Sequence, residues 1–203
     1  MLHTVAYLEL RPQTLAPALK CVERWLSREG RVGALHACWY SNLGPANRIM
    51  VWRGFDGEEV LIEEQHRLAR SDDPFGAADY LAGLSSDVFR EIDFVGPPSH
   101  AVRGPLFEVR DYVLRPDGLA RLFELWRAGL PARLALAPWV TALYSLAGAT
   151  PRVLHMYPWE SLTQRNAIRD GATAVNWPPR DAPMQINLQE ATIYLASAVS
   201  PIQ

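Results

Sequence analysis

Hydrophobic and polar positions follow the same order of patterns twice along the chain. In the first half, residues 3–11 alternate weakly and are rich in strand formers, which predicts a strand. A stripe of apolar residues at helical spacing follows, at Leu15, Leu19, Val22 and Leu26. The further elements predicted for this half are strands at 34–41 and 48–55, a helix at 57–70 and a closing strand at 88–95.

The second half predicts the same elements in the same order. Residues 107–114 alternate cleanly at period two, and a helical stripe follows at Leu119, Phe123, Trp126 and Leu130. The further elements predicted here are strands at 140–145 and 152–159, a helix at 160–173 and a closing strand at 192–199.

A constant offset of 104 residues relates the two halves. The motif Leu-Arg-Pro-x-x-Leu-Ala at 10–16 returns at 114–120, and Tyr-Ser-x-x-Gly-x-x-x-Arg at 40–48 returns at 144–152. Self-similarity at one fixed offset is the signature of an internal repeat. We therefore predict a first unit at 1–97, a linker at 98–105 and a second unit at 106–203.

The order strand–helix–strand–strand–helix–strand predicts the fold class. It is the order of the ferredoxin-like unit, a four-stranded antiparallel sheet with both helices on one face. The other sheet face would be an association site if it stayed uncovered. We therefore expect an α+β protein in which two tandem ferredoxin-like repeats pack sheet against sheet, as an intrachain dimeric α/β barrel.

Composition narrows the class of protein. The chain has 203 residues, 49% of them hydrophobic, which excludes general disorder. Its net charge of −2 argues against a nucleic-acid binder, and no apolar run approaches the roughly 20 residues of a transmembrane helix. The amino terminus lacks the pattern of a signal peptide, so we expect a cytoplasmic protein. A single lysine, Lys20, among 20 basic residues indicates a GC-rich, bacterial genome.

Two stretches of the second half resemble motifs of the NIPSNAP family. Residues 107–118 read Phe-Glu-Val-Arg-x-Tyr-x-Leu-x-Pro-x-Gly, which is similar to the first-strand motif of that family. In the second stretch His155, Tyr157, Trp159 and Arg165 follow the hairpin. The first half departs from this pattern, with Val51 at the position equivalent to His155 and no arginine equivalent to Arg165.

The resemblance implies a dimeric α/β-barrel fold and a family without a settled enzymatic activity. The wider fold group includes cofactor-free monooxygenases, isomerases and haem-binding enzymes. Likeness of fold sets only a prior expectation about a site.

His155 is the strongest single candidate for chemistry. Strand alternation places it on one face with Val153 and Tyr157, where it could act as a general base beside a hydrogen-bonding tyrosine. The alternative is a half-buried histidine that is hydrogen-bonded to a neighbour and has no chemical role. The second half alone has this histidine, so any reactive site is expected there.

A polar stripe on the first strand of the second half is the next candidate. Glu108, Arg110 and Tyr112 share one face, where they either line a cavity that binds a ligand or form a salt-bridge network. Arg152 could steer an anionic ligand, but its repetition as Arg48 favours a structural role. Two aromatic residues on the neighbouring strands either border the same cavity or belong to the core, namely Tyr144 and Trp159.

Two functions remain open on the sequence. The first is a NIPSNAP-like protein that binds a small, largely apolar molecule or acts as an association scaffold. The second is a cofactor-independent oxygenase or isomerase, with His155 as base and Tyr157 or Arg110 polarising a carbonyl. No cofactor or metal ion is predicted, because the nucleotide-binding and zinc-ligand motifs are absent. Whether the chain forms a homo-oligomer stays open as well.

Overall fold

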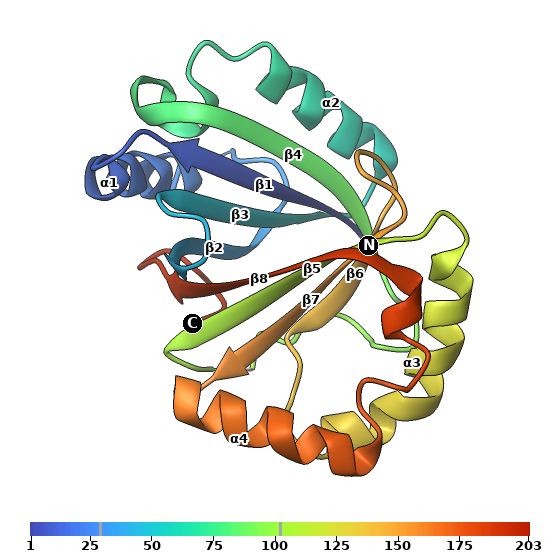
Figure 1. Cartoon of the computed structure of the whole chain (residues 1–203). Helices are drawn as coiled ribbons and strands as arrows, with labels where there is room; N and C mark the ends of the chain where they lie inside the picture. The colour runs from blue at the N-terminus through green and yellow to red at the C-terminus, as the bar shows by residue number, and fades with distance from the viewer. Residues whose placement is uncertain (29, 102) are drawn as a thin grey trace.

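Eight antiparallel strands close into one barrel in the computed structural model (Figure 1). The structure describes residues 1–28, 30–101 and 103–203, so Val102 of the predicted linker lies outside the described residues. The elements of the first half are β1 (Leu2–Leu10), α1 (Leu15–Leu26), β2 (Ala34–Leu43), β3 (Arg48–Phe55), α2 (Glu58–Ala69) and β4 (Leu81–Glu91). Those of the second half are β5 (Leu106–Leu114), α3 (Gly118–Leu134), β6 (Thr141–Ser145), β7 (Arg152–Trp159), α4 (Leu162–Ala172) and β8 (Ile186–Ala196).

The strand order shows how the two halves join. Around the barrel it runs β1-β3-β2-β8-β5-β7-β6-β4, so each half contributes four adjacent strands. The halves meet where β2 pairs with β8 and where β4 pairs with β6. Helices α1 and α2 lie outside the first group of strands, and α3 and α4 lie outside the second (Figure 1). The prediction of two ferredoxin-like units in one α/β barrel is confirmed.

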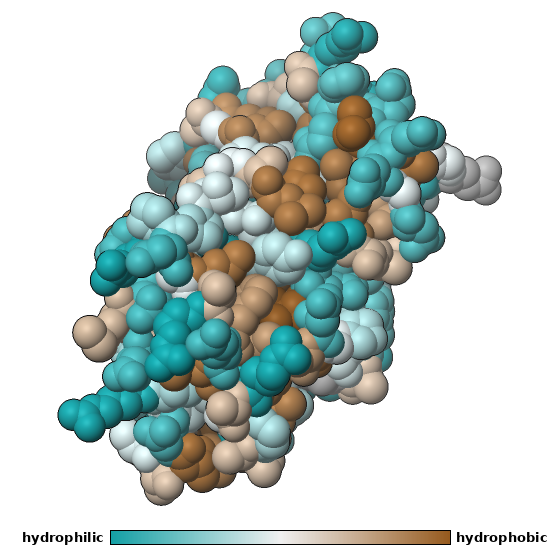
Figure 2. Space-filling model, turned by 90° about the vertical axis from the view of Figure 1, so that its right-hand side faces the viewer, coloured by the Kyte–Doolittle hydropathy of each residue, from teal (hydrophilic) through white to brown (hydrophobic). Residues whose placement is uncertain are grey.

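The barrel interior contains an apolar core that both halves share. Alternate residues of the strands point inward because side chains switch faces along a strand. Trp39 of β2 stacks on Phe107 of β5 with ring centroids 4.4 Å apart and an angle of 13° between the ring planes. Leu154 and Met156 of β7 belong to the same buried cluster. Seen from the side of α3, hydrophobic surface is scattered among hydrophilic residues (Figure 2).

The closing strands begin and end earlier than predicted. β4 covers Leu81–Glu91 instead of 88–95, and β8 covers Ile186–Ala196 instead of 192–199. The early part of β4 has no buried residue and includes Gly83, Ser85, Ser86 and Asp87, so hydrophobic patterning gives it little weight. Phe94 and Val95 lie after the end of β4 and pack against the buried cluster between the sheet and the helices of the second half, which explains why these two positions are apolar.

The buried helix stripes are also shifted from those predicted. In α3 the buried positions are Gly118, Leu122, Trp126, Leu130 and Arg133, while the predicted Leu119 and Phe123 are half-buried. In α1 they are Ala18, Val22 and Leu26. Small residues, Ala18 in α1 and Gly118 in α3, are among those that face the sheet, so the largest apolar residues of a helix are not always its most buried ones. Among the described residues, no helix has the length and apolar character required to cross a bilayer.

The Trp39–Phe107 stack predicts where the two halves depend on each other. Phe107→Ala should lower the free energy of unfolding by about 3–5 kcal/mol, because it leaves a cavity in a fully buried core. Leu84→Ala, on the exposed part of β4, should change it by less than about 0.5 kcal/mol. Urea denaturation of both variants is the measurement. A loss below about 1 kcal/mol for Phe107→Ala would show that the halves are stable without this contact.

Candidate functional site

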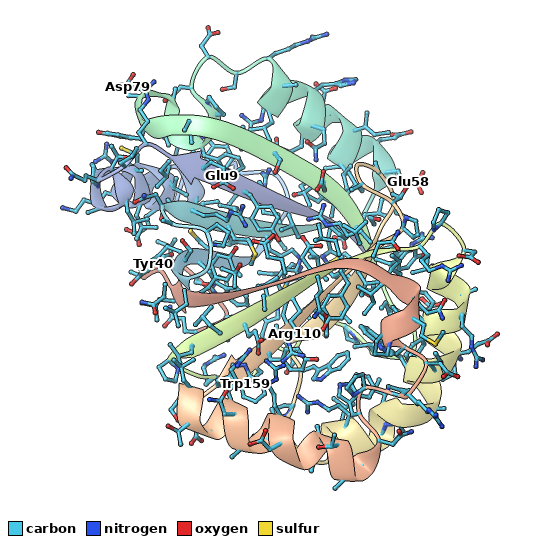
Figure 3. All side chains as sticks on the ribbon, in the orientation of Figure 1. Glu9, Tyr40, Glu58, Asp79, Arg110 and Trp159 are labelled. Carbon is cyan, nitrogen blue, oxygen red and sulfur yellow. The ribbon has the colours of Figure 1, made fainter. Side chains whose placement is uncertain are left out.

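The polar and aromatic candidates meet on the outer face of β5 and β7. Arg110 lies opposite His155 in the strand register, and Glu108 lies opposite Tyr157. This face looks toward the helices of the second half, not into the barrel. Figure 3 places Arg110 and Trp159 between these strands and α4.

A buried carboxylate organises this face. Glu108 is completely buried and accepts hydrogen bonds from Arg110 Nε at 3.0 Å and from Arg165 Nη2 of α4 at 2.5 Å. Trp159 Nε1 donates to the same carboxylate at 2.9 Å. Burial alone would raise the pKa of Glu108, but the hydrogen bond from Arg165 and the charge of Arg110 outweigh it and lower the pKa to about 2. Glu108 is therefore ionised at neutral pH and ties α4 to the sheet.

His155 is enclosed by aromatic rings. The ring centroids of Tyr112, Trp126 and Trp139 lie 4.6, 5.0 and 5.5 Å from that of the histidine. Burial, then the charges of Arg110 and Arg133, hold the pKa of His155 well below its usual value. The imidazole is therefore neutral at pH 7.

The hydrogen bond of Tyr157 indicates which tautomer His155 adopts. The Tyr157 hydroxyl lies 2.7 Å from His155 Nδ1, and the guanidinium carbon of Arg133 lies 5.0 Å from the centroid of the Tyr157 ring. Nδ1 is the one acceptor found for the Tyr157 proton among the described residues, so we assign the hydroxyl as the donor and Nδ1 as the acceptor. The neutral imidazole then carries its proton on Nε2. This buried atom has no hydrogen-bond partner among the described residues.

Three adjoining hollows lie beside this histidine, and Arg110 borders all of them. The histidine hollow, about 70 Å³, is bordered by His155, Tyr112, Trp126 and Trp177. The arginine hollow, about 150 Å³, is bordered by Arg110, Arg133, Tyr157, Ile168, Arg169, Ala172, Thr173, Trp177 and Pro178. The outer hollow, about 180 Å³, is bordered by Arg110, Tyr112, Arg169, Gln189, Glu190 and Ala191. Because they share Arg110, we refer to the three hollows together as the cavity, with an aromatic end at His155 and a basic end at Arg169.

The structure leaves three of the sequence candidates away from this cavity. Arg152 lies on the opposite face of the sheet, where it pairs with Asp111 at 2.7 Å and with Asp87. Tyr144 packs against Phe123 of α3 with ring centroids 5.6 Å apart. Trp159 is fully buried behind the cavity, where it bonds Glu108. Glu108 itself borders none of the hollows and acts through Arg110.

The sequence analysis missed much of the cavity wall. Arg133 extends the buried stripe of α3 by one turn and is 3% exposed. Its helical spacing from Trp126 and Leu130 is the sequence pattern that could have predicted a buried arginine here. Arg169 of α4 carries no such pattern. Within the described ranges, no group of three or more His, Cys, Asp or Glu side chains is placed to hold a metal ion.

Comparison with known families finds a match in the half of the chain that contains these hollows. The NIPSNAP family model matches residues 107–201. The carboxy-terminal half of the chain is a NIPSNAP domain. The outer face of β5 and β7 and all three hollows therefore lie within the NIPSNAP domain. No curated protein sequence matches the chain significantly.

Similar solved structures extend over both halves. An anthrone oxidase-like protein superposes with a TM-score of 0.69 at 9% identity, covering 97% of this chain and 91% of its own. A candidate monooxygenase from Lactobacillus acidophilus NCFM superposes with a TM-score of 0.63 at 6% identity, covering 96% of this chain and 92% of its own. At such identities the likeness shows the fold of the whole barrel and not an activity.

The first half is filled at the positions equivalent to Arg110 and His155, and a hollow of about 240 Å³ in this half lies elsewhere, bordered by Trp25, Arg28, Gly30, Arg31, Val32 and Arg67. At the positions 104 residues before Arg110 and His155 stand Ala6 and Val51, both buried in an apolar cluster that also includes Phe75. Arg53, at the position equivalent to Tyr157, is 1% exposed and bonds Glu64 at 2.5 Å. The buried guanidinium of this half is therefore matched by a carboxylate, and the space is filled.

The ion pairs of Glu108 predict how stability of the NIPSNAP domain depends on pH. A carboxyl whose pKa falls from 4.5 to about 2 on folding stabilises the folded state above pH 4.5, and this contribution is lost as the pH falls toward 2. Glu108→Gln should lower the free energy of unfolding at pH 7 by about 3 kcal/mol, because it leaves two guanidinium groups without their carboxylate. The variant should lose less additional stability between pH 5 and about pH 3 than the parent protein does.

Urea denaturation at each pH is the measurement, and Glu124→Gln is the matched control. Glu124 pairs with Arg121 at 2.9 Å on the surface, so its loss should cost less than about 1 kcal/mol. Equal costs for the two variants would contradict the role assigned to Glu108.

Proposed function

We propose that the NIPSNAP domain binds a small, largely apolar molecule in the cavity between its sheet and α4. The observation that carries the proposal is the buried Nε2 of His155, which has no partner in the described chain and belongs to a ring that borders a cavity. A buried donor without a partner costs about 1–3 kcal/mol. A ligand oxygen that accepts from Nε2 would offset this cost.

The size and walls of the cavity support a ligand with a single ring. An apolar cavity of about 150 Å³ accommodates one benzene molecule. The histidine hollow is smaller than this, and the arginine hollow that adjoins it is of this size. Ligand sites combine apolar and aromatic walls with a few polar groups that fix orientation. Here Trp126 and Trp177 supply the walls and His155 supplies the oriented donor.

A cofactor-independent oxygenase or isomerase is the second candidate. The solved structures with this fold include a candidate monooxygenase and an anthrone oxidase-like protein, which favours such an activity by analogy. A base at His155 would need an unprotonated Nε2, and Nδ1 would then donate to the Tyr157 oxygen. The Tyr157 proton would lose its acceptor in that arrangement, so binding is the better supported function.

An oxygen electrode distinguishes the two functions. With anthrone as the probe, we expect oxygen uptake equal to that of the His155→Phe variant, because three fused rings exceed the space beside the histidine. If the parent protein consumes oxygen with anthrone and His155→Phe does not, the oxygenase function is supported in place of the binding function.

Acetophenone is a direct probe of the proposed binding, since it has one ring and one carbonyl oxygen. We expect it to bind the protein, and His155→Phe to weaken the affinity about three- to ten-fold through loss of one hydrogen bond. Ligand-observed NMR titration is the measurement. His66→Phe, on the outside of α2, should leave the affinity unchanged. Absence of acetophenone binding to the parent protein would overturn the proposal.

A further inference from the structure

The arginine hollow has a surplus of positive charge. Arg110, Arg133 and Arg169 border it, and none of its lining residues is acidic. The nearest buried carboxylate is Glu108, which is already shared between Arg110 and Arg165. Glu190 borders the outer hollow, but its side chain is half exposed and lies 3.7 Å from Arg48.

Arg133 is the least compensated of these groups. Its side chain is 3% exposed, and it contacts the carbonyl oxygen of Ala137 at 3.0 Å and the ring of Tyr157, whose centroid lies 5.0 Å from the guanidinium carbon. Burial and the charge of Arg110 lower the pKa of Arg133, although Tyr157 partly opposes this. A buried charge without an opposite charge is costly, and proteins rarely keep one without a partner. The first half follows this rule, because its buried Arg53 bonds Glu64.

Arg169 adds a second cation at the mouth of the hollow. No ion pair with a carboxylate is found for it among the described residues, and burial together with repulsion from Arg110 and Arg165 lowers its pKa. Guanidinium groups bind carboxylates through two parallel hydrogen bonds, which suits a planar anion.

We propose that the ligand of this cavity is a small aromatic anion, with its ring beside Trp177 and the His155 end and its carboxylate among Arg110, Arg133 and Arg169. Trp177 borders both hollows and Arg110 borders all three, so one molecule can reach both ends. This inference rests on the proposed binding function and adds the chemical class of the ligand.

Benzoate and benzamide test the charge at constant size. At pH 7, benzoate should bind the full-length protein at least about ten-fold more tightly than benzamide. Arg169→Gln should remove most of that preference. Arg180→Gln removes the same charge from the segment before β8 but does not border the hollow, so the preference for benzoate should persist. Ligand-observed NMR titrations give all of these affinities.

The outcomes separate this inference from the proposed function. Equal affinities for benzoate and benzamide, or a benzoate preference that survives Arg169→Gln, would overturn the anionic class while acetophenone binding keeps the cavity as a site. If the parent protein binds none of the three probes, the proposed function fails, and the ligand class fails with it.

Discussion

The structure of the candidate site depends on one buried carboxylate. Glu108 sits between the sheet and α4, and it must be ionised and fully hydrogen-bonded to be stable there. Arg165 reaches it from α4, Arg110 from the same strand and Trp159 from the neighbouring strand. These bonds fix where α4 lies and hold Arg110 at the point where three hollows meet. The cavity therefore exists because polar groups hold the helix against the sheet at this end, whereas apolar packing fills the corresponding space in the first half.

The two halves show how one arrangement of elements leads to different interiors. In the first half, Ala6, Val51 and Phe75 fill the space between sheet and helices, and Arg53 is neutralised by Glu64. In the NIPSNAP domain, larger polar and aromatic residues stand at the corresponding strand positions, and buried Arg133 has no carboxylate partner in the described chain. Such an arrangement destabilises the ligand-free domain, and proteins accept local costs of this kind mainly at functional sites. The barrel interior shared by both halves supplies the stability that offsets this cost.

Much of the fold could be predicted from the sequence, because strand alternation and helical spacing are local signals. The strands at 48–55 and 152–159 have the bounds predicted for them. The predicted bounds of the closing strands were wrong because their first halves are at most partly buried and lack a regular apolar alternation, while the apolar residues Phe94 and Val95 pack outside the barrel. Alternation also placed His155, Glu108 and Arg110 on one face. It could not show that Arg133 and Arg169 join them, because those contacts depend on how α3 and α4 dock. Alternation does imply that Arg152, three residues before His155 on the same strand, faces the other way.

The central claim is that the arginines of the cavity in the NIPSNAP domain carry positive charge that a bound anion neutralises. The most direct measurement is a crystal structure of the protein soaked with benzoate. Our account predicts electron density for the ring beside Trp177, with the carboxylate within hydrogen-bonding distance of Arg110, Arg133 and Arg169. An empty cavity at a benzoate concentration that saturates binding in solution, or a carboxylate turned away from these arginines toward solvent, would contradict it.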